Sequence, residues 1–167
     1  KTTQLGVELD HLSNLYLNSS SSQKIKKAVS FADQAHQGQF RKSGEPFIIH
    51  PINVGMILAS LKMDADTIIA GLLHDVVEDC DISLAEVRKE FGRNVSKLVD
   101  GMTKLLQLDE KLKDQSQAEY FQKMALATAE DVRVVIIKLA DRLHNLKTIE
   151  HLPRHKQIKK SKEFDCS

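Results

Sequence analysis

Apolar residues recur three or four positions apart along most of this chain, and this spacing constrains its fold more than any other feature. The clearest example is the run Ile25, Ala28, Val29, Ala32 and Ala35. Only three prolines interrupt the pattern, and no hairpin signal separates two alternating segments. We therefore expect an all-α fold, a bundle of about seven helices.

Local signals set several helix boundaries. Pro51 suits the first turn of one helix. Asp64 is a good N-cap for the next helix, which we expect to run without a break to about Cys80. Ser83 and Glu86 have the spacing of a capping box, which predicts a further helix after them.

The second half of the chain contains three more segments with helical character. Two amphipathic stretches are expected at 94–108 and 117–129. The β-branched run 132–140 is compatible with a buried strand, but apolar spacing continues through Leu146. We therefore predict a helix there, with Asp131 capping its start.

A chain of 167 residues is long enough for one domain with its own core. Four consecutive serines, residues 19–22, predict a polar linker. We therefore expect an N-terminal segment over 1–22, a helical domain over 23–160, and a truncated or foreign tail over 161–167.

The charge balance narrows the classes of partner. With 24 basic and 23 acidic residues, the chain is not a polycationic binder of nucleic acid or membrane surfaces. No apolar run approaches the roughly 18 residues needed to span a bilayer. The only two cysteines lie far apart, so a disulfide framework is not expected and a cytoplasmic location is favoured.

Several of the seven histidines stand beside charged residues, most clearly in the segment HDVVED at 74–79. On a continuous helix, His74 would stack over Glu78 and Asp75 over Asp79. The flanking residues are apolar, so burial of this cluster would require a cation or a hydrogen-bond network. A divalent metal would meet that requirement, and a solvated helix end is the alternative.

Two more residues extend the candidate site. His50 precedes the rigid Pro51, and Asp141 lies in an apolar helix where an unpaired aspartate is rarely tolerated. A structural histidine, and an ion pair of Asp141 with Lys138 or Arg142, are the alternatives. Nitrogen and oxygen ligands with room for water suit manganese, iron or zinc, and the candidate ligands are His50, His74, Asp75 and Asp141.

A basic loop, Arg41-Lys42-Ser43-Gly44, precedes this site. When this segment is considered alone, its sequence favours an ordinary solvated loop. Beside a metal, its guanidinium and ammonium groups would suit a phosphate or a nucleotide base. Further positive charge comes from Lys138, Arg142 and Lys147, so the sequence favours a polyphosphate ester as ligand.

Four segments in order resemble the hydrolase domain of the RelA/SpoT family: AHQGQFRKSGEPFIIHP at 35–51, LLHDVVED at 72–79, FG at 91–92 and IKLADRLHNLKT at 137–148. The resemblance covers about residues 23–160. It implies an HD-type metal-dependent phosphohydrolase that uses Mn²⁺ to remove the 3′-diphosphate of (p)ppGpp. The products would be pyrophosphate and GDP or GTP, and the reaction would end the stringent response.

The resemblance also implies roles for single residues. His50, His74, Asp75 and Asp141 would hold the metal, and Glu78 and Asp79 would position and activate the attacking water. The nucleotide would contact Arg41, Lys42 and Ser43 in the loop, and Asn145, Thr148, Lys138 and Arg142 on the last long helix. His144 is expected to support the site rather than to ligate.

Two departures and two alternatives stay open. Cys80 replaces the threonine that usually follows the acidic pair, and the chain stops where family members continue. Synthetase and regulatory domains, and regulatory protein partners, would belong to a longer natural chain. The alternatives are an HD phosphohydrolase for another nucleotide and a regulatory module that binds nucleotide without turnover.

Overall fold

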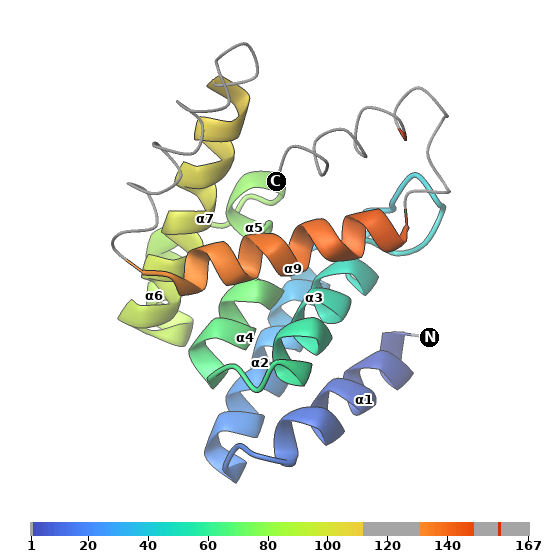
Figure 1. The fold of residues 1–167 in the computed structure, drawn as a ribbon, viewed down its shortest axis with the longest axis vertical. Coiled ribbons are helices and arrows are strands. Elements are labelled where there is room, and N and C mark those ends of the chain that lie inside the picture. Colours follow the sequence, from blue (N-terminus) through green and yellow to red (C-terminus); the bar gives the residue numbers. More distant parts are fainter. Residues whose placement is uncertain (1, 112–130, 149–156, 158–167) are drawn as a thin grey trace.

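The computed structural model describes residues 2–111, 131–148 and residue 157 of the chain, and within them it confirms the all-α prediction (Figure 1). The only bridge among these residues is isolated and joins Phe40 to Pro46. None of the described helices has the length and apolarity needed to cross a membrane. The helices are α1 (Thr2–Asn14), α2 (Ser19–Ala35), α3 (Ile49–Ser60), α4 (Ala65–Leu72), α5 (Val76–Asp79), α6 (Leu84–Phe91), α7 (Arg93–Lys111) and α9 (Arg133–Lys147).

Helix α3 is the centre of the bundle and packs against α1, α4 and α9. Figure 1 shows α9 crossing over α3 and α4. The loop before α3 lies beside the C-terminal end of α9 (Figure 1). Helices α3 and α4 approach closely because each has a glycine at the contact. A Cβ on Gly55 would lie 3.2 Å from Leu72 Cδ2, and one on Gly71 would collide with Leu58 Cδ1. This approach brings the start of α3 next to the end of α4.

The predicted linker at residues 19–22 is wrong, because these serines form the first turn of α2. The Asn18 side chain caps the helix by accepting the Ser21 N–H at 2.9 Å. Ser22 is buried and donates to the Asn14 side chain. Capping and burial thus overcome the low helix propensity of serine. Helix α1 packs on α3 with Leu9 fully buried.

Most predicted boundaries are confirmed. Pro51 lies in the first turn of α3, and the Asp64 carboxylate caps α4 by accepting the Thr67 N–H. Ser83 and Glu86 form both bonds of a capping box at the start of α6.

The run 132–140 is helical, as predicted, within α9. Asp131 accepts the Arg133 backbone N–H at 3.0 Å, although Val132 occupies the N-cap position. The stretch 94–108 lies within α7. The predicted stretch at 117–129 and the tail at 161–167 lie outside the described residues.

The prediction of one continuous helix from Asp64 to about Cys80 is wrong. Helix α4 ends at Leu72, and the chain leaves helical geometry before α5 begins at Val76. The Leu73 N–H reaches two carbonyl oxygens at 3.0 and 3.2 Å, which tightens the last turn of α4. The expected stacking of His74 over Glu78 on a single helix therefore does not occur.

Candidate metal centre

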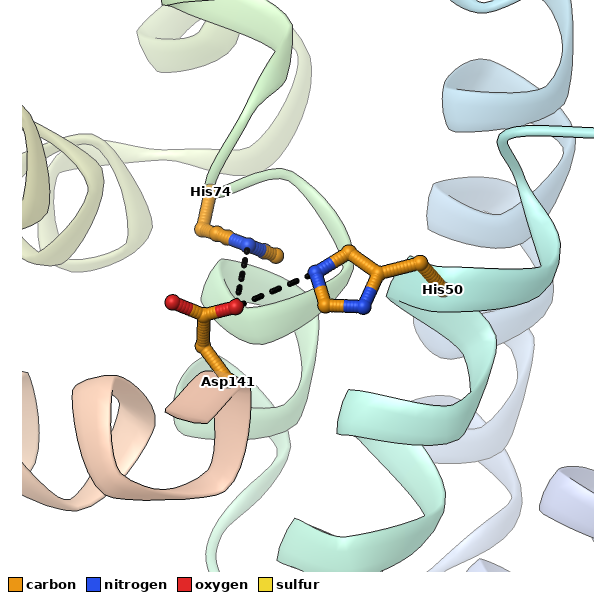
Figure 2. Close-up of side chains that lie close together, drawn as sticks. All are labelled: His50, His74 and Asp141. Atoms are coloured by element: carbon orange, nitrogen blue, oxygen red, sulfur yellow. Dashed lines mark ion pairs between the residues drawn. The ribbon is translucent and has the colours of Figure 1, made fainter. Parts of the chain in front are cut away.

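Three separate segments deliver the candidate ligands to one point. His50 lies in the first turn of α3, and Asp141 lies in the middle of α9. His74 and Asp75 occupy the break between α4 and α5. Figure 2 shows His50, His74 and Asp141 pointing toward one another from these elements.

The three side chains of Figure 2 form a compact buried group. The His50 Nε2 lies 3.2 Å from Asp141 Oδ1, and the His74 Nε2 lies 3.9 Å from the same oxygen. One donor atom from each residue lies within 4.8 Å of the other two. Two imidazoles and a carboxylate at such separations can converge on a single transition ion.

Asp75 borders this group and does not enter its closest set of donors. Its Oδ1 lies 3.1 Å from His74 Nε2, and its Oδ2 lies 3.8 Å from His50 Nε2. The side chain is slightly more exposed than that of Asp141. The carboxylate therefore lies within reach of an ion placed between the histidines.

The ring of His74 is oriented as in a metal ligand. Its Nδ1 lies 2.7 Å from the Gly71 carbonyl oxygen, and a carbonyl only accepts, so Nδ1 carries the proton. Nε2 therefore faces Asp75 and Asp141. This nitrogen is buried and has no hydrogen bond of acceptable geometry among the described residues. A neutral His74 presents its free electron pair there, which fits a divalent metal.

The electrostatics of the group favour a positive charge at the same point. Burial alone would lower the pKa of His74, but the carboxylates of Asp75 and Asp141 overcome this and raise it to about 9. Burial would raise the pKa of Asp141, but its close contact with His50 and the nearby positive charges of His74 and Lys138 hold it below its usual range. A proton or a metal ion can supply this positive charge.

The buried Lys138 also neutralises the carboxylates. Its side chain is only 6% exposed, and its Nζ lies 3.6 Å from Asp141 Oδ2. The structure therefore contains the Lys138–Asp141 ion pair, which was one alternative explanation for Asp141. Asp141 contacts the histidines as well as this lysine. Arg142 follows Asp141 directly and is half-buried.

The acidic pair lies on the short helix α5 with its side chains largely exposed. Partial burial raises the pKa of both Glu78 and Asp79, and the nearby carboxylate of Asp75 raises both further. Both pKa values thus move in the direction that favours proton uptake near neutral pH. A division of roles between the two carboxylates stays a prediction.

The basic loop forms a tight turn that directs one of its cations toward the candidate metal ligands. The Arg41 N–H donates to Glu45 O, and the Gly44 N–H donates to Arg41 O, each at 2.8 Å. Gly44 has a φ of 81°, which glycine adopts without strain. Arg41 turns inward, whereas Lys42 is exposed and Ser43 is half-buried within the turn.

Arg41 contacts helix α9 next to the candidate ligand Asp141. The Nη2 of Arg41 donates to Asn145 Oδ1 at 2.8 Å. Asn145 in turn donates from Nδ2 to Asp141 Oδ1 at 2.7 Å. The Thr148 hydroxyl is turned back onto its own helix, 3.2 Å from the His144 carbonyl oxygen. Arg41 and Asn145 are thus joined by hydrogen bonds to the candidate ligand Asp141, whereas Thr148 lies at the C-terminal end of α9.

Comparison with known proteins identifies this arrangement. The family model for the HD domain matches residues 28–165, which is most of the chain. The chain belongs to the HD-domain family. A solved structure described as a metazoan ortholog of SpoT that hydrolyzes ppGpp has a TM-score of 0.65 and 31% identity to this HD domain. The match covers 86% of this chain and 80% of that one.

Two bacterial relatives agree with this result. A GTP pyrophosphokinase of Streptomyces coelicolor is 49% identical over 147 residues, which are 88% of this chain and 17% of the relative. A guanosine-3′,5′-bis(diphosphate) 3′-pyrophosphohydrolase of Borreliella burgdorferi is 44% identical over 153 residues, 92% of this chain and 23% of the relative. The chain thus spans about a fifth of the length of these curated relatives, and the resemblance to the RelA/SpoT family is confirmed.

Two contacts of this HD domain were not predicted from the sequence, although a supporting role for His144 was expected. His144 lies against His50, with 2.7 Å between their Nδ1 atoms. A signal was present in the sequence, since residue 144 follows Asp141 by three positions and shares its helix face. The second contact joins the Gln39 side chain to the Asp79 carbonyl oxygen at 3.0 Å. No local pattern marks Gln39, because its partner is distant in the chain.

Proposed function

We propose that this HD domain hydrolyses the 3′-diphosphate of (p)ppGpp, and that its resident metal is Mn²⁺. The observation that carries the proposal is the convergence of His50, His74 and Asp141 beside an inward-turned Arg41. A metal site next to a guanidinium fits a phosphorylated nucleotide. The names of the relative from Borreliella burgdorferi and of the SpoT ortholog specify the same reaction class.

The ligands would be His50, His74, Asp141 and, from the border of the group, Asp75. When bound, the ion would lower the pKa of a ligated water and polarise a phosphoryl oxygen. Lys138 would keep Asp141 ionised for this task, because its ammonium group lies 3.6 Å from the carboxylate. Manganese is preferred over calcium because two of the proposed ligands are imidazoles.

The proposed reaction breaks the bond between the ribose 3′-oxygen and its phosphorus. Water attacks that phosphorus, and Glu78 or Asp79 takes a proton from the water. The other member of the pair, protonated beforehand, gives its proton to the 3′-oxygen as that oxygen leaves, so that pyrophosphate and GDP or GTP are released. The raised pKa values of both carboxylates support this exchange of protons.

The remaining predicted residues would bind the nucleotide. Arg41 offers a planar guanidinium for stacking on the base or for a phosphate, and the exposed Lys42 offers a mobile ammonium. Ser43 would contact the nucleotide from the same turn. On α9, Asn145, Thr148 and Arg142 would line the other side. Synthetase and regulatory domains, as well as regulatory protein partners, would belong to a longer natural chain, and we place the protein in the cytoplasm.

The test is release of pyrophosphate from ppGpp in the presence of Mn²⁺, followed by ³¹P NMR. We expect Asp75→Ala to abolish release while circular dichroism shows an intact helical fold. Glu8→Ala, at an exposed position on α1, is the matched control and should keep full activity. Binding of ppGpp and Mn²⁺ without any pyrophosphate would instead identify a regulatory module. Turnover of other nucleotides but not ppGpp would identify a different HD phosphohydrolase.

A further inference from the structure

Two buried imidazoles meet behind the proposed metal site. The Nδ1 atoms of His50 and His144 lie 2.7 Å apart, and the two residues are 3% and 7% exposed. Two ring nitrogens can form a hydrogen bond only when one carries a proton and the other offers an electron pair. The shared proton of this contact therefore lies either on Nδ1 of His50 or on Nδ1 of His144. In the first arrangement a neutral His50 has a free electron pair on Nε2, and in the second it has a proton there.

Arg41 decides between the two arrangements. Its Nη1 lies 3.3 Å from the same Nδ1 of His144. A guanidinium has only donors, so this nitrogen of His144 must accept. His50 must then donate from Nδ1. A neutral His50 with its proton on Nδ1 presents the electron pair of Nε2, the nitrogen that lies 3.2 Å from Asp141 Oδ1 (Figure 2).

The second terminal nitrogen of the Arg41 guanidinium acts on Asp141, the proposed ligand on α9. Arg41 Nη2 donates to Asn145 Oδ1, which fixes the orientation of that amide. The opposite end of the amide then donates from Nδ2 to Asp141 Oδ1. One cation of the loop thus sets the hydrogen bonds behind two ligands, one on α3 and one on α9.

We propose that His144 is a positioning residue for the metal ligand His50. It holds His50 in the Nδ1–H tautomer and fixes the orientation of the His50 ring. Arg41 in turn fixes His144. The inference rests on the metal site of the proposed function. It assigns no proton transfer to His144. Outer hydrogen-bond partners of this kind typically contribute 10- to 100-fold to metal affinity.

The test compares two substitutions by calorimetric titration of the metal-free protein with Mn²⁺. His144→Asn places an amide oxygen near the former Nδ1 and keeps an acceptor for His50. His144→Leu has a similar volume and removes the acceptor. We expect the leucine variant to bind Mn²⁺ about 10- to 100-fold more weakly, and the asparagine variant to stay within about threefold of the wild type. His11→Leu, which removes an exposed imidazole on α1, should change nothing.

A second measurement does not depend on any variant folding correctly. Long-range ¹H–¹⁵N spectra of the wild-type protein loaded with diamagnetic Zn²⁺ should show His144 with an unprotonated Nδ1 and a protonated Nε2. A protonated Nδ1 on His144 would overturn the inference. Equal Mn²⁺ affinity of a folded His144→Leu variant would also overturn it, with the proposed hydrolysis left standing. A wild-type protein that fails to bind Mn²⁺ would overturn both.

Discussion

The imidazole of His50 and the carboxylate of Asp141 join the first turn of α3 to the middle of α9, with 3.2 Å between Nε2 and Oδ1. Both side chains are buried, and the burial of an ionised carboxylate is tolerated only with compensating charge or hydrogen bonds. The pair therefore links the stability of the bundle to whatever cation the site holds.

A bound metal should stabilise the fold. We expect Mn²⁺, added to protein treated with a chelator, to raise the melting temperature. At a concentration of about 100 times the Kd the gain is about 2.7 kcal/mol, or roughly 5–10 °C for a chain of this size. Scanning calorimetry with and without the metal checks this. Asp141→Asn should lose most of the shift, and an equal shift in that variant would place the ion elsewhere.

The acidic pair should act in chemistry and not in metal binding. Glu78→Gln and Asp79→Asn each remove one proton acceptor while nearly preserving shape. We expect pyrophosphate release to fall by about 10²- to 10⁴-fold, with the Mn²⁺-induced melting shift retained. Glu8→Gln on α1 is the control of equal chemistry at an exposed site. Loss of the melting shift in the Glu78 or Asp79 variant would show that these carboxylates serve as ligands.

The close approach of α3 and α4 depends on glycine. A Cβ on Gly71 would collide with Leu58 Cδ1, so Gly71→Ala should lower the free energy of unfolding by about 1–3 kcal/mol. Gly55→Ala should cost less, because its nearest neighbour would be Leu72 Cδ2 at 3.2 Å. At Gly6, where the nearest atom would lie 4.0 Å away, alanine should stabilise α1 by up to about 1 kcal/mol. Urea unfolding measures the series, and equal effects at Gly6 and Gly71 would contradict this account.

Asp131 should make stability depend on pH in a defined direction. Hydrogen bonds from the Arg133 side chain and backbone hold the pKa of Asp131 below its ordinary value of 3.8. The ionised form therefore stabilises the folded state above 3.8, and this contribution is lost as the pH falls through the lowered value. The difference in unfolding free energy between wild type and Asp131→Asn should be constant from about pH 5 to 8 and shrink below about pH 4. A difference that grows under acid conditions would contradict the assigned pairing.

The elements that the sequence predicted well are those decided by contacts within a few residues. Ser83 and Glu86 satisfy each other across one turn, and Asp64 caps the helix that follows it directly. The break after Leu72 has no such local cause, because no glycine or proline occupies positions 73–75. It follows from packing, since Leu73 and His74 are both buried against the rest of the bundle.

The same distinction applies to the site. Asp141 was identifiable because an aspartate in an apolar helix requires a partner. Its position relative to His50 and His74 depends on how α9 crosses α3 and α4, which no local spacing encodes. The pairing of Arg41 with Asn145 likewise joins a loop to a helix far along the chain, and only the fold brings them together.

Three consecutive residues of the loop between α2 and α3 form backbone or side-chain contacts that hold the loop in place. Gln39 holds the Asp79 carbonyl oxygen, Phe40 bridges to Pro46, and Arg41 reaches across to α9. Surface loops usually accept inserted residues, because their backbone is free on both sides. Here one added residue between Gln39 and Arg41 would shift at least one of these contacts relative to the others. We therefore expect this loop to tolerate added residues less well than a surface loop without such contacts.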